Sequence, residues 1–362
     1  MDVVLTSLAD DAALDDVAAG FLAAAKPGAV LVDTSTVSPA ASARVAERAE
    51  AAAVAYLRAP VSGNPTVVRA GSLSFIVSGP SETVDRVEPI LLAIGPTVYR
   101  VGDAEEARVV KLAINLMFGD FLALSMDTLI NQASKYWFLT GGAQGVPLVI
   151  RSVVGGGGRF GAIHSQMPVS WLTGITGLKI VAPATPADAK GLLKAAIRDD
   201  NPVVFLEHKR LYSLKGEVGG DEVVPLGRAR IAREGTRITL VTAMKGVHDC
   251  LEAAEALAAD GIDAEVVDLR TLRPLDLETV LASVAKTNRV AVVEEGPLTG
   301  GWAGELLALI AEHGLGELDD AWRIATPDTP IPYSPPLEDA HLPGPERIAA
   351  EVRSRVSPAG DG

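Results

Sequence analysis

The first hundred residues alternate between short apolar runs and amphipathic segments. The runs Val3–Ser7 and Ala29–Asp33 are rich in apolar residues, which is typical of strands buried in a parallel sheet. Asp11–Ala25 and Pro39–Ala53 carry apolar residues at helical spacing, and Ser38 is placed to cap the second of these helices. The same patterns predict strands at 72–79 and 96–102 and a helix at 82–94. Residues 1–110 are therefore predicted to form an α/β domain.

A proline-free segment follows, from Glu105 to Tyr136, with Gly119 as its single glycine. Apolar residues recur in this segment at helical spacing. The simplest prediction is one long helix, kinked at Gly119, whose part 111–136 joins the first block to the rest of the chain.

Two further α/β blocks are predicted beyond this helix. The block at 137–210 combines apolar strands with a helix at 187–198, and the block at 235–356 alternates strands with helices. The polar, glycine-bearing stretch 211–234 between them is predicted to be an interdomain linker, and 357–362 a frayed tail.

Composition and charge narrow the class of protein. Hydrophobic residues make up 48% of the 362 residues and charged residues 22%, which indicates a globular chain with substantial cores. The net charge of −14 argues against nucleic acid and anionic membranes as partners. No apolar run approaches the roughly 20 residues that cross a bilayer, and no signal-peptide pattern is seen, so a cytoplasmic location is expected. Cys250, the single cysteine, lies on the apolar stripe of a predicted helix and is expected in the core.

Polar residues suited to chemistry follow the strands of the first block. Thr36 comes after an apolar strand, at the sheet edge where open α/β folds bind ligands, although a role in a turn or cap explains it equally well. A compact turn at Ser62 offers backbone N–H groups to a carboxylate. Lys111 and Asn115 share one helix face and can orient or protonate a substrate oxygen, whereas a lone helical lysine is usually only solvated.

The segments DTSTVSP (33–39), APVSGN (59–64) and KLAIN (111–115) together resemble the 3-hydroxyisobutyrate dehydrogenase family, over residues 2 to about 117. The resemblance implies a partial Rossmann-like domain with NAD(P) as its cofactor. It implies that Thr36 lies near the nicotinamide and that Lys111 is catalytic. It assigns substrate binding to Ser62, Gly63, Asn64 and Asn115. The family's G-x-G-x-x-G turn follows no strand of this sequence, so weak dinucleotide binding is expected.

A second set of candidate residues lies in the middle block. Four glycines, Gly155–Gly158, permit unusual backbone conformations and precede His164, which is placed for proton transfer near neutral pH. A flexible loop with a structural histidine explains this local pattern slightly better. The end of the predicted helix offers backbone carbonyls and the side chains of Asp199 and Asn201 as oxygen ligands for a cation. From their spacing alone, a polar turn is the favoured interpretation.

The segments VPLVIRSVVGGGGRFGAIHSQ (146–166), DAKGLLKAAIRDDNPVVFLEH (188–208) and DTPIPYSPPLEDA (328–340) resemble the β subunit of thiamine-diphosphate-dependent 2-oxo acid dehydrogenases of the pyruvate type. The resemblance covers about 117–356 and implies an incomplete transketolase-like pyrimidine-binding domain followed by a complete transketolase C-terminal-like domain. It implies that His164 is catalytic and that Phe121 lies beside the aminopyrimidine ring of thiamine diphosphate. It places potassium at Ala196, Ile197, Asp199 and Asn201.

The same resemblance implies partners. An α subunit shares the thiamine diphosphate, two copies of each subunit form an α2β2-like assembly, and the assembly binds the acyltransferase core of the complex. The family's cofactor-activating glutamate belongs to a segment before MFGDF (117–121), where the dehydrogenase-like region stands instead.

The sequence therefore predicts a β-subunit-like component for oxidative decarboxylation whose activity is impaired. The alternatives are an NAD(P)-dependent 3-hydroxyacid dehydrogenase-like fragment and a non-catalytic fusion or truncated protein. Thiamine diphosphate binding with an α subunit favours the first function, dinucleotide binding favours the second, and binding of neither favours the third.

Overall fold

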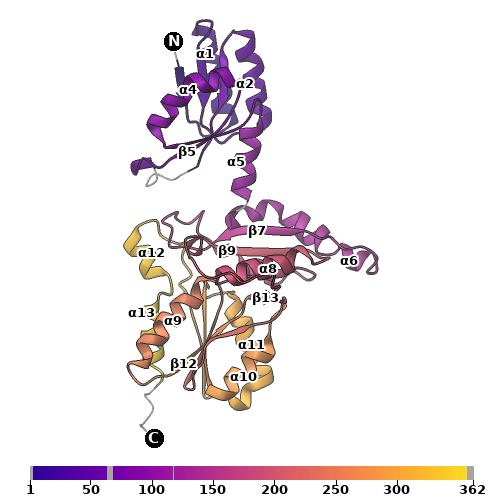
Figure 1. Cartoon of the computed structure of the whole chain (residues 1–362), viewed down its shortest axis with the longest axis vertical. Coiled ribbons are helices and arrows are strands. Elements are labelled where there is room, and N and C mark those ends of the chain that lie inside the picture. The colour runs from indigo at the N-terminus through magenta and orange to yellow at the C-terminus, as the bar shows by residue number, and fades with distance from the viewer. Residues whose placement is uncertain (1–2, 63–67, 117, 357–362) are drawn as a thin grey trace. The chain divides into compact units, whose positions relative to one another are not determined.

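The computed structural model describes residues 3–62, 68–116 and 118–356. The chain forms two compact units, Met1–Leu116 (unit 1) and Met117–Gly362 (unit 2), and each has hydrophobic cores of its own (Figure 1). The boundary falls inside the segment for which the sequence predicts one long helix.

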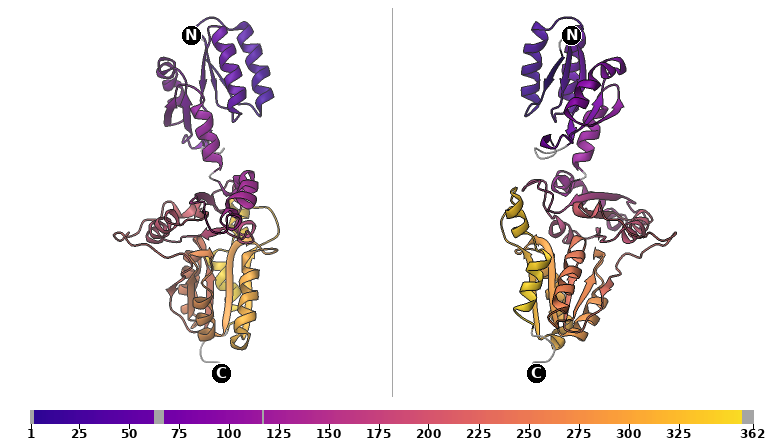
Figure 2. Two further views of the ribbon diagram at one scale, coloured as in Figure 1. Left: turned by 90° about the vertical axis from the view of Figure 1, so that its right-hand side faces the viewer. Right: turned by 60° about the vertical axis from the view of Figure 1, so that its left-hand side comes forward.

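Unit 1 is a six-stranded sheet with helices on both faces (Figure 2). Its elements are, in chain order, β1 (Val3–Thr6), α1 (Asp11–Ala24), β2 (Val30–Asp33), α2 (Pro39–Ala51), β3 (Ala55–Arg58), β4 (Val61–Ser62), β5 (Ser74–Ser78), α4 (Ser81–Ile94), β6 (Thr97–Gly102) and α5 (Glu106–Leu116). Strands β1, β2 and β3 are parallel neighbours, β5 pairs with β3 antiparallel, and β4 and β6 also pair with β5. The α/β fold predicted from the sequence is confirmed.

Alternation along β2 builds two cores, one on each face of the unit 1 sheet. Leu31 packs in a cluster with residues of α1 and α2, whereas Val30 and Val32 pack in a cluster with residues of α4. Because every residue of β2 is buried, Val30, Leu31 and Val32 form an uninterrupted apolar run, which ends at the buried Asp33. The helix α2 begins where the sequence predicts, since the hydroxyl of Ser38 accepts the N–H of Ala41.

The predicted long helix over Glu105–Tyr136 is wrong. Helix α5 ends at Leu116, and at Phe118 the backbone is extended and forms an isolated parallel β-bridge with Val153. A Cβ atom on Gly119 would lie 2.7 Å from the Val154 side chain, so the chain packs closely on that strand at this point. Short pieces follow: a 3₁₀ helix (Gly119–Ser125), a π-helix (Thr128–Ala133) and α6 (Tyr136–Leu139).

Unit 2 contains two sheets. After α6, its elements are, in chain order, β7 (Val149–Val154), α7 (Val169–Thr173), β8 (Lys179–Val181), α8 (Pro186–Ile197), β9 (Val203–His208), β10 (Arg230–Arg233), β11 (Ile238–Thr242), α9 (Lys245–Ala258), β12 (Ala264–Asp268), β13 (Thr271–Arg273), α10 (Leu277–Thr287), β14 (Arg289–Pro297), α11 (Trp302–Gly314), β15 (Asp320–Thr326), α12 (Pro335–His341) and α13 (Pro345–Arg353); short 3₁₀ helices also lie at Lys209–Leu211 and Leu315–Glu317.

The division of strands between the two sheets of unit 2 differs from the division into blocks that the sequence predicts. One sheet has the order β13-β8-β9-β7 and the other the order β10-β12-β11-β14-β15. Strand β13 follows β12 in the chain but pairs antiparallel with β8, so a segment of the third predicted block completes the sheet of the second. One hydrophobic cluster runs through both sheets, from Leu122 to Ile310. The two predicted blocks are therefore packed as one body.

The predicted linker 211–234 is partly corrected. Its last residues form β10, which pairs antiparallel with β12 at the edge of the second sheet. The expected core position of Cys250 is confirmed, because the residue is fully buried in α9 and burial raises the pKa of its thiol well above the ordinary value. Within the described parts of the chain, no helix is long and apolar enough to span a bilayer.

The second sheet of unit 2 contains a buried carboxyl group with consequences for stability. Glu294, at the end of β14, is 3% exposed and accepts the N–H groups of Trp302 and Ala303, both at 3.1 Å. Burial raises the pKa of Glu294 to about 7, against the opposing effect of the two backbone donors. Folding therefore disfavours the ionised form.

We expect Glu294 to make unit 2 less stable as the pH rises. Its contribution is fully present below the ordinary pKa of 4.5 and is lost as the pH rises to about 7, a change on the order of 3 kcal/mol. Urea denaturation at pH 5 and pH 8 should show that Glu294→Gln loses less stability than the unchanged protein over this interval. Glu305→Gln, an exposed position on α11, is the matched control and should follow the unchanged protein. Equal losses for Glu294→Gln and the unchanged protein would contradict this account.

Candidate active site

The four glycines follow strand β7 and make a tight loop in unit 2. Gly155 has φ +90°, and a Cβ atom on it would lie 2.2 Å from Nε2 of His208. Both the backbone conformation and the lack of space therefore require glycine at this position. The loop passes over the end of β9, where His208 is almost fully buried.

A carboxylate of the second sheet holds the beginning of this loop. Glu295 accepts the N–H of Gly156 through one oxygen and contacts Nε2 of His208 at 2.7 Å through the other. The N–H of Arg210 donates to Nδ1 of His208 at 3.2 Å, so Nε2 carries the ring proton that Glu295 accepts. Burial by itself raises the pKa of Glu295, but the interactions with His208 and Gly156 outweigh it and hold the pKa below its ordinary value.

A second carboxylate holds the middle of the loop. Glu338 of α12 has a fully buried side chain and accepts the N–H of Gly157 at 2.8 Å. Its other oxygen accepts both the backbone N–H of Arg159, at 3.1 Å, and the guanidinium of the same residue, at 2.8 Å. The guanidinium also pairs with Asp339. Glu295 and Glu338, both from the C-terminal part of unit 2, thus hold the glycine loop through its backbone N–H groups.

Lys209 connects the loop to an aromatic cluster. Its ammonium donates to the carbonyl of Gly155 at 2.6 Å and to the carbonyl of His164. It also lies 5.6 Å from the ring centre of Phe118 and 5.8 Å from that of Phe160, within the range of cation–π attraction. Burial lowers the pKa of Lys209, although the neighbouring Asp120 opposes the shift.

The structure brings together two residues that the sequence resemblance singles out. Phe121 packs edge-to-face on the half-buried ring of His164, with 5.3 Å between ring centres, and Phe118 does the same at 5.9 Å. The neighbour of Phe121, Asp120, accepts the N–H of Gln166 at 2.9 Å and so ties the aromatic segment to the end of the histidine loop. The arrangement offers an aromatic wall and an imidazole, which can hold a planar ring and exchange a proton.

The candidate residues of unit 1 are less closely assembled. Thr36 is exposed after β2, and Ser62 is exposed at the end of β4, whereas Gly63 and Asn64 lie outside the described residues. Lys111 is half-buried in α5, and burial lowers the pKa of its ammonium. Asn115 belongs to the same helix, one turn further on. The described residues therefore place Lys111 and Asn115 on one helix without showing a completed substrate pocket.

Sequence reasoning missed the residue that holds α5 to the rest of unit 1. Arg108 is 1% exposed and pairs with the fully buried Asp33 at the end of β2. Its guanidinium also donates to the carbonyl of Ser35, next to Thr36, and to the hydroxyl of Tyr56 at 3.2 Å. The signal in the sequence was an arginine one turn before Lys111 on the same helix. Arg108 thus fixes the helix that carries Lys111 against the loop that carries Thr36.

The two glutamates at the start of α5 have structural roles. Glu105 pairs with the largely buried Arg58. Glu106 accepts the N–H of Ala104 at 2.7 Å, and backbone hydrogen bonds lower the pKa of its carboxyl. Both belong to unit 1, whereas the cluster around His164 belongs to unit 2.

The residues proposed for potassium lie at the end of α8 and in the turn that follows it. The carbonyl of Ala196 accepts the N–H of Asp199 at 3.2 Å, and a carboxylate oxygen of Asp199 accepts the N–H of Asn201 at 3.0 Å. The other carboxylate oxygen of Asp199 pairs with the ammonium of Lys179. Ile197 is 64% exposed. The oxygen donors suit a monovalent cation in kind, but Lys179 already neutralises the carboxylate among them.

We expect Lys179 to suppress a specific effect of potassium on stability. In the unchanged protein, replacing sodium chloride with potassium chloride should leave the unfolding midpoint nearly unchanged. In Lys179→Met the carboxylate of Asp199 loses its partner, and potassium should then stabilise the protein more than sodium does. An ion at 100 times its Kd is expected to raise the free energy of unfolding by ~2.7 kcal/mol. If potassium, but not sodium, stabilises the unchanged protein by an amount of this order, this account is contradicted. Thermal unfolding in matched salts provides the measurement.

Three domain families match successive parts of the chain. The NAD binding domain of 6-phosphogluconate dehydrogenase matches residues 1–102. The transketolase pyrimidine binding domain matches residues 99–215, and the transketolase C-terminal domain matches residues 227–348. The change of family thus falls near the start of α5.

Several similar proteins match about two thirds of the chain. Acetoin:2,6-dichlorophenolindophenol oxidoreductase subunit beta of Cupriavidus necator is 48% identical over 243 residues, which are 67% of this chain and 72% of that protein. 2-Oxoisovalerate dehydrogenase subunit beta of Bacillus subtilis is 43% identical over 66% of this chain and 74% of that protein. The mitochondrial pyruvate dehydrogenase E1 component subunit beta of Dictyostelium discoideum is 43% identical over 63% of this chain and 66% of that protein.

A solved structure supports the fold. It is described as a split gene transketolase, inactive beta4 tetramer, and it superimposes with a TM-score of 0.54 at 20% identity. The match covers 76% of this chain and 88% of that one. At this identity the similarity concerns the fold alone.

Proposed function

The chain belongs to the β-subunit family of thiamine-diphosphate-dependent 2-oxo acid dehydrogenases, and from this membership we propose that it acts as a β-subunit-like component that assembles with an α subunit but has impaired catalysis. The observation that carries the proposal is the loop of unit 2 that runs from Gly155 to His164. Its glycines are held by Glu295 and Glu338, and its histidine packs on Phe121.

The site residues present suit one part of a thiamine diphosphate site. Phe121 and Phe118 supply an aromatic wall for the aminopyrimidine ring, and His164 stands beside it as a proton carrier. When bound, thiamine diphosphate supplies the nucleophilic carbon that attacks a 2-oxo acid. The roles of His164 as a catalytic residue and of Phe121 as a cofactor contact are part of this proposal.

The carboxylate next to this wall does not suit the activation of such a cofactor. One oxygen of Asp120 accepts the N–H of Gln166, and the other is closed off from the surface without a hydrogen-bond partner among the described residues. The described arrangement therefore presents neither oxygen of Asp120 to a ring at the aromatic wall. Unit 1 precedes the wall, in place of the segment that supplies the family's glutamate. We therefore attribute the impairment to this missing carboxylate.

An exposed apolar segment supports association with a partner. The four residues of α6, Tyr136, Trp137, Phe138 and Leu139, are between 41% and 78% exposed. Four consecutive large apolar side chains on a surface are typical of an interface. An α2β2-like assembly with an α subunit, and binding of that assembly to an acyltransferase core, are further parts of this proposal that follow from the family. The family also implies potassium at the end of α8, where Lys179 competes with the ion for the carboxylate of Asp199.

A dehydrogenase-like role of unit 1 is the second candidate function. The match to an NAD binding domain over residues 1–102 favours it, with Thr36 at the cofactor and Lys111 at the substrate. The lowered pKa of Lys111 suits proton transfer. In this case unit 1 and unit 2 are two parts of a fusion, and NAD(P) binds to unit 1 alone.

Assembly with an α subunit tests the principal proposal. The chain co-expressed with an α subunit of the acetoin or pyruvate type should give a mixed complex in native mass spectrometry. A Trp137→Ser, Phe138→Ser double variant should lose the complex, whereas Tyr99→Ser, at an exposed aromatic position of unit 1, should retain it. A chain that stays free of the α subunit under these conditions overturns the proposal. Binding of NAD(P) without any α-subunit complex would favour the second candidate.

A further inference from the structure

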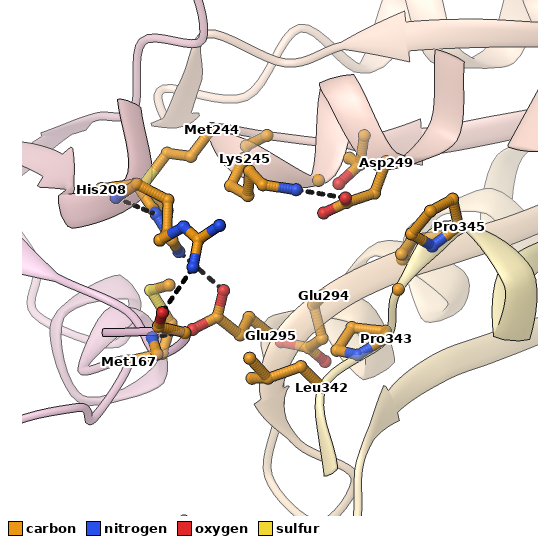
Figure 3. A pocket seen from close by; sticks show the side chains of 18 of the residues that line it. Met167, His208, Met244, Lys245, Asp249, Glu294, Glu295, Leu342, Pro343 and Pro345 are labelled. Atoms are coloured by element: carbon orange, nitrogen blue, oxygen red, sulfur yellow. Dashed lines mark hydrogen bonds and ion pairs between the residues drawn. The ribbon is translucent and has the colours of Figure 1, made fainter. Parts of the chain in front are cut away.

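A cavity of about 390 Å³ lies in unit 2 beside the glycine loop (Figure 3). Its walls come from the end of β11 and the start of α9, from the end of β14, and from the connection between α12 and α13. The backbone of Gly156 and Gly157 also lines it. The volume falls within the roughly 300–1,000 Å³ typical of small-molecule sites.

The cavity stands at a distinctive place in the sheet. Strand β11 lies between β12 and β14, and the chain runs from β11 to β12 on one side and only later to β14 on the other. The order of strands therefore reverses between β11 and β14. In open parallel sheets, ligands bind in the crevice outside the carboxyl ends of the strands at such a reversal. The cavity opens at this reversal.

The chain turns from β11 into α9 in a strained conformation. Met244 has φ +53° and ψ −128°, a region that glycine normally occupies. A Cβ atom on Gly246 would lie 2.2 Å from the hydroxyl of Thr242, so the first turn of α9 packs directly on the strand. Within the described part of the chain, no side chain caps the start of α9. The N–H of Val247 donates to the carbonyl of Met244 at 3.2 Å, so the N–H groups left for a ligand at the cavity wall are those of Lys245 and Gly246.

Opposite charges face each other across the cavity. Lys245 lies on the wall formed by α9 and pairs with Asp249 through one of its three N–H donors (Figure 3). Glu295 lies on the wall formed by β14, where each of its oxygens has accepted one hydrogen bond and can accept another. Leu342, Pro343 and Trp302 add apolar surface.

We propose that this cavity binds a small zwitterionic 2-amino acid with an apolar side chain. The carboxylate of the ligand is bound by Lys245 and the first N–H groups of α9, where the helix dipole favours negative charge. The ammonium is bound by Glu295, and the side chain packs on Leu342 and Pro343. A purely anionic ligand would pair with Lys245 but not with Glu295, and a purely cationic ligand would pair with Glu295 but not with Lys245.

A ligand in the cavity would contact a residue that directly supports the glycine loop. Glu295 accepts the N–H of Gly156, so a ligand ammonium on Glu295 becomes part of the support of the loop. The carbonyl of Gly155 and that of His164 share the ammonium of Lys209, so the same support extends to the histidine. The proposed site is thus a regulatory one and does not depend on an active cofactor.

Calorimetric titration of the full chain with three related compounds tests the proposal. L-Valine carries both charges, 3-methylbutanoate lacks the ammonium, and 2-methylpropylamine lacks the carboxylate. Valine should bind about tenfold more tightly than either analogue, because each analogue leaves one charged wall unpaired. Absence of valine binding, or equal binding of valine and 2-methylpropylamine, overturns the proposal.

Two variants locate the binding. Lys245→Met should weaken valine binding about tenfold, whereas Lys215→Met, an exposed position outside the cavity, should leave it unchanged. Ala243→Phe adds a large side chain to the cavity wall and should abolish binding in the folded protein. Hydrogen exchange adds a readout that does not depend on variants, since valine should slow exchange at Gly156 and Gly157. Binding that Ala243→Phe leaves intact, or that leaves this exchange unchanged, places the ligand elsewhere and overturns the proposal.

Discussion

Replacing Arg108 with methionine should destabilise unit 1 by about 3–5 kcal/mol, because it leaves the carboxylate of Asp33 buried without its charged partner. The side chains of both residues are at most 1% exposed, so water cannot take the place of the guanidinium. Since a domain of this size is stable by roughly 5–15 kcal/mol, the loss is a large fraction of the total. Denaturation followed by hydrogen exchange, peptide by peptide, measures unit 1 separately from unit 2.

Arg44→Met is the matched control for this change. Arg44 pairs with Asp15 at 2.7 Å, but its side chain is 53% exposed, so the expected loss of stability is small. Unit 2 should keep its exchange rates in both variants, because it has hydrophobic cores of its own. A loss in Arg108→Met no larger than that in Arg44→Met would show that the buried pair does not hold unit 1 together.

Replacing Glu338 with glutamine should release the glycine loop of unit 2. The carboxylate accepts three hydrogen bonds, from the N–H groups of Gly157 and Arg159 and from the guanidinium of Arg159. Glutamine has one acceptor oxygen and an NH₂ group that faces these donors, so at least one of them loses its partner inside the protein. We expect a loss on the order of 3 kcal/mol and faster hydrogen exchange over 155–164.

The neighbouring residue provides the control. Asp339 pairs with the same guanidinium, but its side chain is 63% exposed, so Asp339→Asn should cost less than about 1 kcal/mol and leave the loop protected. If Glu338→Gln leaves exchange in the loop as slow as Asp339→Asn does, then Glu295 alone holds the loop and the role given to Glu338 is wrong.

Local sequence patterns predicted the elements well where packing follows hydrophobic periodicity. The strand β2 and the helix α2 lie where an apolar run and the cap residue Ser38 indicate. The same rule failed at Phe118 and Gly119. There the sequence is compatible with a helix, but a β-bridge to Val153 and close packing on Val154 decide the conformation. Contacts with a strand 35 residues away are not visible in local periodicity.

The sequence predicted only those residues of the candidate site that belong to recognisable motifs. The meeting of Phe121 and His164 agrees with the resemblance that singled them out, and their chemical roles stay proposals. Glu295, Glu338 and Lys209 were missed because their partners are backbone groups more than 40 residues away in the chain. Arg108 was missed because a buried arginine looks like an exposed one until its partner Asp33 is placed beside it. Long-range polar pairs of this kind leave no periodic trace in a sequence.

Decarboxylation by the assembled complex tests the central claim most directly. The chain is combined with an α subunit, thiamine diphosphate and magnesium, and carbon dioxide release from a 2-oxo acid is compared with that of the same α subunit and its own β subunit. We predict a mixed complex whose rate is lower by about 10²–10⁴, the usual contribution of a general acid–base group. A mixed complex that matches the rate of the reference pair would contradict the account, because it would show that catalysis does not need the missing carboxylate.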